Sequence, residues 1–296
     1  MKKQLIAILM AAAVVPAIMN AEIVLTEDLS VSGYLDIYYS DIDLPGDNSS
    51  SGVNEFELDF SFTTDPFFSV VELSYDGTDV GFETAIVGYN ITEELSVSVG
   101  NILSYLGWES YDATGLYQFS YAYRGFSPLY PAYAVGASLD YVTDAFSLGV
   151  WVGDSDDGDI SYELMGKFTG VEGLTLFAAW ADDPYYETIN FWASYEVAGF
   201  TFALEYVDVD NEFMEDSTGY LAMINYAWES AALTLRYSIE ETDGYADDWE
   251  LITISPSYAF SDNLLGLLEL SLIQDGAYMG EEDPDYMFAA ELIYTF

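Results

Sequence analysis

The chain contains no cysteine and no histidine, and only 5 of its 296 residues are lysine or arginine. The missing histidine excludes Ser-His-Asp and Cys-His catalysis, and the missing cysteine means that no disulfide contributes to stability. The few basic residues stand against 52 aspartates and glutamates, which gives a formal net charge of −47. Because such a surface repels nucleic acid and anionic ligands and attracts cations, we expect no nucleic-acid partner.

High net charge is typical of disordered chains, but disorder also requires few aromatic and β-branched residues. In this chain 51% of the residues are apolar and 17% are aromatic, including 26 tyrosines. The composition therefore indicates a folded protein.

The first residues have the pattern of an export signal. Two lysines after the first methionine are followed by an apolar run from Leu5 to Met19 and by the small residue Ala21. The run is short for a membrane-spanning helix, and no later apolar stretch has helical length. We predict a signal peptide over 1–21, cleaved after Ala21, and a mature chain over 22–296.

The mature sequence repeats an alternation of apolar and polar residues that predicts β-strands. Residues 55–62 read Glu-Phe-Glu-Leu-Asp-Phe-Ser-Phe, so one face of this segment is apolar and the other is acidic or polar. Residues 285–296 show the same period of two, with an aromatic or aliphatic residue at every second position. Such segments have about the length of a tilted strand that crosses a bilayer.

The connections between these segments fall into a short and a long class that alternate along the chain. Segments 64–66 and 170–173 are short turns, whereas 40–54 and 208–217 are longer and strongly acidic. A soluble sheet also has one apolar and one polar face, but it has no reason to sort its loops by length. The sequence therefore predicts an all-β fold, a transmembrane antiparallel up-and-down β-barrel with its short turns on the periplasmic side.

The same alternation predicts the number of strands. When 285–296 is the closing strand, the two classes of connection alternate correctly back to Asp144, and from the first strand they alternate correctly to Gly100. Treating 116–123 as a further strand would place the short turn at Asp144 on the outer side. We predict sixteen strands, with eighteen as the alternative, and one long external loop over 106–131 between the fifth and sixth strands.

The beginning of this loop resembles a known family. Residues 100–109 read Gly-Asn-Ile-Leu-Ser-Tyr-Leu-Gly-Trp-Glu, which is similar to the G-x-x-x-x-x-x-G-[YW]-E segment of the β-barrel porin-2 (OmpL-like) family. General porins also have sixteen strands and a long loop between the fifth and sixth. The resemblance implies that the 106–131 loop folds into the lumen as a constriction. The residues expected there are Arg124, Tyr121, Tyr123 and Glu109.

Alternation places many charged side chains on the inner face, where water keeps them hydrated. A charge that faced lipid at the bilayer midplane would be destabilising, by about 2–4 kcal/mol for Arg or Lys and by less for Asp or Glu. The basic ones are Lys167 and Arg236, which are either structural partners of acidic neighbours or part of the transport path. Arg124 is either another structural partner or, in a constriction loop opposite acidic residues of the barrel, the source of a transverse field across the narrowest part of the pore. The acidic ones are Asp36, Glu55, Glu57, Asp59, Glu72, Glu163, Glu205, Glu240, Glu250, Glu269 and Glu291.

An acidic lumen predicts a porin: a water-filled, moderately cation-preferring passive diffusion channel for small hydrophilic solutes, since charges of one sign favour ions of the other. One alternative is a substrate-specific channel, for example for sugars, because aromatic residues are frequent over 105–130. Another is a structural or adhesive surface barrel that presents acidic loops. We expect no enzymatic activity, because barrel enzymes of outer membranes generally use histidine.

The predicted location is the outer membrane of a Gram-negative-type bacterium. The expected partners are membrane lipid and lipopolysaccharide, small ions and solutes, and the barrel-assembly machinery, since Tyr294 and Phe296 resemble its terminal signal. The sequence leaves open whether the protein forms a homotrimer, because a lipid-facing surface and a subunit interface are both apolar.

One acidic segment has the appearance of a calcium loop. It contains Asp154, Asp156, Asp157 and Asp159, but the position at which an EF-hand has its last glutamate is Met165. A solvated acidic loop is the simpler interpretation. We therefore predict no specific metal site and no cofactor, and leave open loosely bound Ca²⁺ or Mg²⁺ at the outer loops.

Overall fold

The computed structural model describes residues 22–43, 49–109, 112–123, 129–154, 159–213, 215–244, 248–275 and 285–296. The predicted signal peptide, 1–21, lies outside these ranges. Within them the helical structure is one 3₁₀ turn, η1 (Ala113–Gly115), and no helix is long and apolar enough to cross a membrane.

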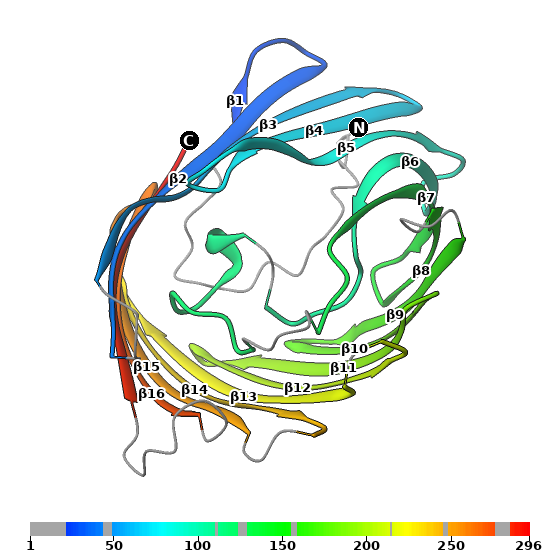
Figure 1. The fold of residues 1–296 in the computed structure, drawn as a ribbon. Coiled ribbons are helices and arrows are strands. Elements are labelled where there is room, and N and C mark those ends of the chain that lie inside the picture. Colours follow the sequence, from blue (N-terminus) through cyan, green and yellow to red (C-terminus); the bar gives the residue numbers. More distant parts are fainter. Residues whose placement is uncertain are drawn as a thin grey trace.

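The described residues form a closed antiparallel barrel (Figure 1). Each strand pairs with its neighbours in sequence, and the last strand, β17, also pairs with β2, which closes the ring. The two-residue strand β1 adds to the edge of β2 and is not part of the ring, so the barrel has sixteen strands. The predicted fold class and strand number are confirmed, and the alternative of eighteen is wrong. The strands are β1 (Ile23–Val24), β2 (Leu29–Ile42), β3 (Ser50–Thr64), β4 (Phe67–Tyr75), β5 (Val80–Asn90), β6 (Leu95–Leu103), β7 (Tyr133–Val142), β8 (Phe146–Asp154), β9 (Ile160–Val171), β10 (Leu174–Asp183), β11 (Tyr186–Val197), β12 (Phe200–Asn211), β13 (Ser217–Trp228), β14 (Ala231–Thr242), β15 (Trp249–Ser261), β16 (Leu264–Asp275) and β17 (Asp285–Thr295).

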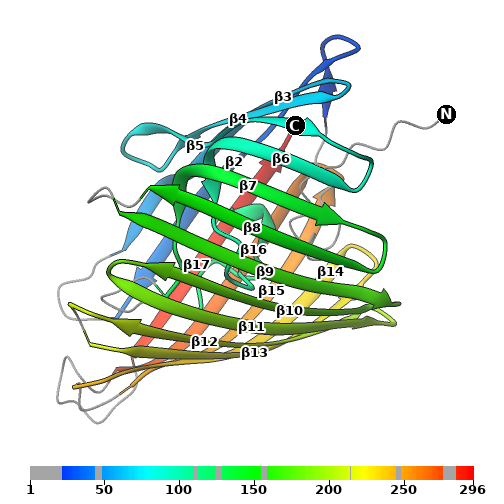
Figure 2. The ribbon, with the colours of Figure 1, turned by 90° about the vertical axis from the view of Figure 1, so that its right-hand side faces the viewer.

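The period of two in each strand separates an apolar outer surface from a polar inner one. In β17 the exposed residues are Tyr286, Phe288, Leu292 and Tyr294, while Glu291 and Thr295 on the other face are buried. The strands are strongly tilted relative to the barrel axis (Figure 2). A closed ring pairs the backbone groups of every strand, and the apolar exterior matches the hydrocarbon of a bilayer.

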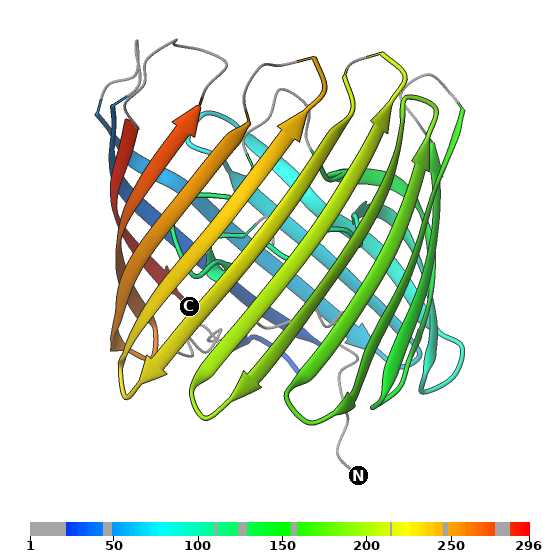
Figure 3. The same ribbon diagram turned by 90° about the horizontal axis from the view of Figure 1, so that it is seen from below.

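Most connections are sorted by length as predicted, and Figure 3 shows tight turns gathered at one end of the barrel. The turn between β11 and β12 consists of Ala198 and Gly199, both with positive φ (51° and 82°), as a two-residue hairpin turn with the strand twist requires. The connection over 182–185, which the alternation of short and long connections assigns to the longer class, is an exception. Strand β10 ends at Asp183 and β11 begins at Tyr186, so only two residues join them.

A long segment between β6 and β7 lies inside the barrel. We call residues 104–132 the inner loop; its described parts are 104–109, 112–123 and 129–132. Figure 1 shows these parts, in green, within the ring of strands. They contain no strand, so 116–123 is not a barrel stave, and the loop joins the fifth and sixth strands of the ring as predicted.

Candidate functional site

Carboxylates on one side of the barrel hold the backbone of the inner loop. The amide of Tyr105 donates to Glu163 of β9 at 2.8 Å, and the amide of Trp108 donates to Glu205 of β12 at 2.7 Å. Further along, the amide of Ser120 donates to Glu269 of β16 at 2.9 Å. Hydrogen bonds to ionised acceptors are among the stronger ones, so these contacts fix the loop against this side.

We call the wall that carries Glu163, Glu205 and Glu269 the anchoring side. Arg236 of β14 belongs to it and makes several hydrogen bonds to the loop. Its Nη1 lies 2.7 Å from Oε1 of Glu109 and 2.6 Å from the carbonyl oxygen of Ser120. Its Nη2 donates to the hydroxyl of Ser120 at 2.7 Å and to the carbonyl of Tyr121 at 3.3 Å. The residue is 2% exposed. The planar guanidinium, with five donors, satisfies several loop acceptors at once.

Glu109 in turn organises its own loop. Its Oε1 accepts from the side chain of Gln118 at 2.8 Å, and its Oε2 accepts from the amide of Ala122 at 2.7 Å. The carbonyl of Ala122 accepts from Ser238 of β14 at 2.8 Å. The buried pair of Arg236 and Glu109 therefore connects the described parts of the loop to one another and to the barrel wall through hydrogen bonds.

Aromatic residues pack the loop onto this side. Trp108 of the loop meets Trp192 edge to face with ring centroids 5.1 Å apart, and Trp192 stacks on Phe177 at 4.9 Å. The hydroxyls of Tyr130 and Tyr123 donate to Glu205 at 2.6 and 3.4 Å. These tyrosines thus lie against the wall, and burial together with the charge of Glu205 raises their pKa.

The opposite side of the barrel carries a second set of carboxylates, which we call the acidic wall. Two of its hydrogen bonds come from residues of β2 and β3 themselves: Asp36 accepts from Asn54 at 2.8 Å, and Asp59 accepts from Ser32 at 3.1 Å. The members are Asp36 of β2, Glu55, Glu57 and Asp59 of β3, Glu72 of β4 and Glu83 of β5.

A β-bulge builds part of the acidic wall. The pairing of β4 with β5 shifts between Val71, opposite Ala85, and Leu73, opposite Phe82. The extra residue leaves both Glu83 and Thr84 turned from the outer surface, and the amide of Thr84 donates to Glu72 at 3.0 Å. Bulges commonly re-aim side chains at functional sites in this way.

The inner loop also reaches the acidic wall. Ala113 of η1 packs against Tyr34 of β2, and its backbone hydrogen-bonds to Glu55. Burial and the nearby charges of Glu72 and Glu55 raise the pKa of Asp112 to about 8. The side chain of Tyr121 is 45% exposed. Tyr123, in contrast, lies against the anchoring side through its hydroxyl contact with Glu205.

Of the remaining predicted residues, some lie outside the described ranges, some are on the inner face and one is on the outer surface. Arg124, Asp156 and Asp157 lie outside the described residues. Lys167 shares the inner face of β9 with Glu163, and Glu240 is buried on the inner face of β14. Tyr294 is exposed on the outer surface and stacks on Phe296 with ring centroids 6.2 Å apart.

The prediction for Glu250 is wrong, because it shares the outer face of β15 with the exposed Ile252 and Ile254. It is the second residue of the strand, at the edge of the barrel, where an outward charge is reached by water and costs little.

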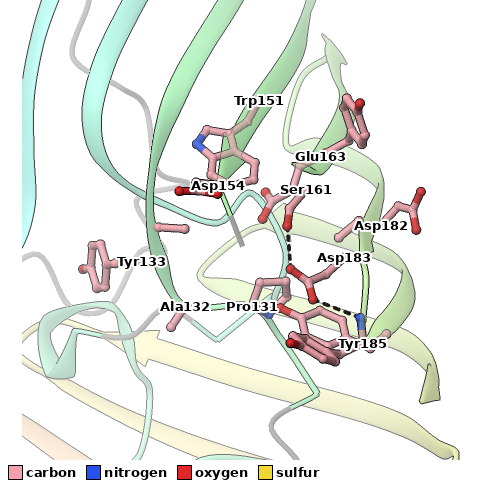
Figure 4. Close-up of a pocket in the computed structure, with 14 residues that line it drawn as sticks. Pro131, Ala132, Tyr133, Trp151, Asp154, Ser161, Glu163, Asp182, Asp183 and Tyr185 are labelled. Atoms are coloured by element: carbon pink, nitrogen blue, oxygen red, sulfur yellow. Dashed lines mark hydrogen bonds between the residues drawn. The ribbon is translucent and has the colours of Figure 1, made fainter. Parts of the chain in front are cut away.

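Asp154 is the last residue of β8, and Asp159 directly precedes β9. Asp154 also lines a cavity of about 210 Å³. Figure 4 shows this cavity between the end of the inner loop and β8–β10. Its lining combines Tyr133, Trp151 and Tyr185 with acidic groups. One of these, Asp183, accepts from Ser161 at 2.5 Å and from the amide of Tyr185 at 3.1 Å.

Two acidic residues of the site, Glu83 and Asp112, were not predicted. The sequence does contain a signal for Glu83: the exposed apolar residues are Val80 and Phe82 on even positions and then Val87 and Tyr89 on odd ones. That change of phase within one strand indicates a bulge. For Asp112 in an irregular loop there is no comparable periodic signal.

No family model and no curated protein matches the sequence. Solved structures share the fold. OmpT of Vibrio cholerae aligns with a TM-score of 0.70 and 16% identity over 93% of this chain and 100% of that one. OmpF of Salmonella typhi, in complex with daunomycin, gives 0.69 and 13% over 93% and 100%, and a mutant of the porin of Rh. blastica gives 0.69 and 15% over 90% and 100%. At these identities the likeness shows the fold alone: a closed barrel like that of outer-membrane porins, with the narrower porin-2 resemblance unsupported.

Proposed function

We propose that the protein is an outer-membrane porin, a water-filled passive diffusion channel that prefers cations. The observation that carries the proposal is that the anchors of the inner loop and the acidic wall occupy different sides of the barrel interior. The inner loop is fastened to the anchoring side, while six carboxylates of β2–β5 form the acidic wall that its η1 turn approaches. Small solutes would pass beside these carboxylates.

The balance of charge supports the preference for cations. Within the described ranges the basic residues are Lys167 and Arg236, on β9 and β14, and neither belongs to the acidic wall. Arg236 is paired with Glu109 and buried, so its charge is compensated and offers little attraction to anions. A ring or wall of carboxylates raises the local concentration of cations.

The preference should be moderate. The Debye length is about 8 Å at physiological ionic strength, so mobile ions screen much of the wall across a wide pore. Several of the predicted lumen-facing acids, Glu163 and Glu205 among them, hold the loop and do not add free charge to the path.

A reversal potential in a planar bilayer under a salt gradient tests the proposal. The wild type should show a cation-directed potential, and Glu72→Gln should reduce it because it removes one wall charge. Glu172→Gln, in the exposed turn between β9 and β10, is the control and should match the wild type. A zero or anion-directed wild-type potential would overturn the cation preference, and a barrel without conductance would favour a structural or adhesive surface protein.

The 210 Å³ cavity favours a second candidate, a substrate-specific channel for sugars. Aromatic rings provide stacking surfaces, and carboxylates such as Asp183 accept hydrogen bonds from hydroxyl groups. Block of the ion current by added maltose or longer oligosaccharides, relieved by Trp151→Ala, would support it. An unchanged current at all sugar concentrations would leave general diffusion as the function.

The same proposal places the chain in the outer membrane of a Gram-negative-type bacterium after removal of 1–21. Lipid and lipopolysaccharide would cover its apolar exterior, and the assembly machinery would read Tyr294 and Phe296. A homotrimer is part of the proposal, since the structural neighbours include a trimer form of OmpT of Vibrio cholerae. We assign the chain no enzymatic role and no cofactor.

A further inference from the structure

Three carboxylates of the acidic wall converge on one point. One carboxylate oxygen each from Glu55, Glu57 and Glu83 lies within 4.8 Å of the other two. Glu55 and Glu57 are two positions apart on the inner face of β3, and Glu83 comes from β5, where the bulge has turned it inward. Bringing three negative charges together in this way is unfavourable unless something positive compensates them.

No basic side chain of the described residues supplies that compensation for Glu57. This side chain is 5% exposed, and its Oε2 is buried without a hydrogen-bond partner. The basic residues of the described chain, Lys167 and Arg236, are on β9 and β14, and Arg236 is committed to Glu109. A buried carboxylate needs a hydrogen bond, a counter-charge or a metal.

The neighbours of the cluster add negative charge. Asp59 forms a side-chain hydrogen bond with Glu57, and Glu72 and Asp112 of the inner loop are close enough to act electrostatically on Glu57. Tyr133, the first residue of β7, donates its hydroxyl to Oε2 of Glu83 at 3.3 Å. The cluster is thus an all-oxygen, strongly negative environment.

The spacing fits a calcium ion. Ca²⁺ binds oxygen at about 2.3–2.6 Å, so oxygens on opposite sides of one ion are about 5 Å apart. The three oxygens of the cluster, all within 4.8 Å of one another, can therefore belong to one coordination shell. Mg²⁺ takes oxygens at about 2.0–2.1 Å in strict octahedral geometry and usually keeps several waters, so it fits three protein carboxylates less well.

We propose that Glu55, Glu57 and Glu83 form a Ca²⁺ site on the inner wall of the barrel. It differs from the predicted acidic loop at 154–159 in both position and construction. The site deepens the proposed function: because the ion would sit on the acidic wall, its occupancy would lower the current of monovalent cations. That effect on the current rests on the channel function, whereas binding of the metal does not.

Terbium luminescence tests binding directly, since Tb³⁺ replaces Ca²⁺ and is sensitised by nearby tyrosines such as Tyr133. The purified, detergent-folded wild type should show a saturable emission that Ca²⁺ displaces. The double variant Glu57→Gln/Glu83→Gln should lose affinity about tenfold or more, because ligand charge sets the affinity of such sites. Glu172→Gln keeps the acidic outer loops and should bind like the wild type.

Equal Tb³⁺ and Ca²⁺ affinity in the wild type and the double variant would overturn the site, since the outer loops would then account for all binding. Far-UV circular dichroism and a thermal melt verify that the variant is folded. Glutamine keeps the shape of glutamate and removes repulsion, so we expect the variant barrel to be at least as stable as the wild type without Ca²⁺.

A bilayer experiment separates this proposal from the channel function. In Ca²⁺-free K⁺ solution both proteins should conduct, and added Ca²⁺ should reduce the wild-type current in a saturable way while the double variant stays unaffected. Conductance without a difference in Ca²⁺ block would overturn the effect on current. Absence of conductance in Ca²⁺-free solution would overturn the channel function, and the luminescence result would still decide the metal site.

Discussion

Arg236 and Glu109 form a buried ion pair, with Nη1 2.7 Å from Oε1, although 127 residues separate them in the chain. Arg236 belongs to strand β14 and Glu109 to the inner loop, so the pair joins the constricting segment to the barrel. Both side chains are removed from water, and each satisfies further hydrogen-bond partners of the loop. The pair is therefore one of the contacts that fix the position of the loop in the lumen, beside those of Glu163, Glu205 and Glu269.

Arg236→Met should release the inner loop. It leaves Glu109 buried without its counter-charge, which typically costs about 3–5 kcal/mol. Protease cleavage within the loop should become faster, and the single-channel current should become larger and noisier. The double variant Arg236→Met/Glu109→Gln should recover much of the loss, because no uncompensated charge remains. Cleavage rates equal to the wild type in the single variant would contradict the anchoring role.

Glu205→Ala and Glu205→Gln should differ sharply. Alanine removes the acceptor for the amide of Trp108 and for the hydroxyl of Tyr130, and each donor left unsatisfied costs about 1–3 kcal/mol. Glutamine retains one acceptor oxygen and should cost about 1 kcal/mol, the net value of a typical hydrogen bond. Unfolding in guanidinium and loop proteolysis provide the measurements. Similar losses in the two variants would mean that the charge of Glu205, and not its hydrogen bonds, holds the loop.

The barrel and its closing strand could be predicted because a period of two is a local property of each segment. Asp36 and Ile37, neighbours in β2, face opposite sides as the pattern requires, and the chain from 285 onward pairs with β2. The same rule was wrong for Glu250, because at the edge of a barrel water is present on both sides and the outer face tolerates a charge.

The partners of the charged side chains could not be predicted. Arg236 was placed on the inner face beside Glu240, but alternation says nothing about a contact with Glu109, which depends on how an irregular loop crosses the lumen. Glu83 was missed because a single extra residue at the bulge shifts the phase of β5, and alternation read from Val87 and Tyr89 places it outside.

Leu235→Arg should destabilise the barrel, although the next residue, the inward-facing Arg236, is already an arginine. Leu235 is 46% exposed on the outer surface of β14, and an arginine that faces the bilayer midplane costs about 2–4 kcal/mol. Glu172→Lys, in an exposed turn, should leave the stability within about 0.5 kcal/mol of the wild type. Reversible unfolding from lipid vesicles measures both. A neutral effect of Leu235→Arg would mean that this face does not contact lipid.

The cation preference should depend on pH through Asp112. Burial and the charges of Glu72 and Glu55 raise the pKa of this carboxyl from 3.8 to about 8. The docked loop therefore keeps a proton that the unfolded chain releases above its lower pKa, so Asp112 makes the docked loop less stable as the pH rises from about 4 to 8. The effect levels off above pH 8, where both states are ionised.

Between pH 6 and pH 9 Asp112 gains a negative charge in the constriction, so the reversal potential should become more cation-directed and loop proteolysis faster. In Asp112→Asn this part of the pH response should disappear. Asp76→Asn is the control, because hydrogen bonds from the backbone of Asp79 and Thr78 lower the pKa of Asp76 and keep it ionised throughout this range. If Asp112→Asn kept the full wild-type response to pH, the titrating group would have to lie elsewhere in the acidic wall.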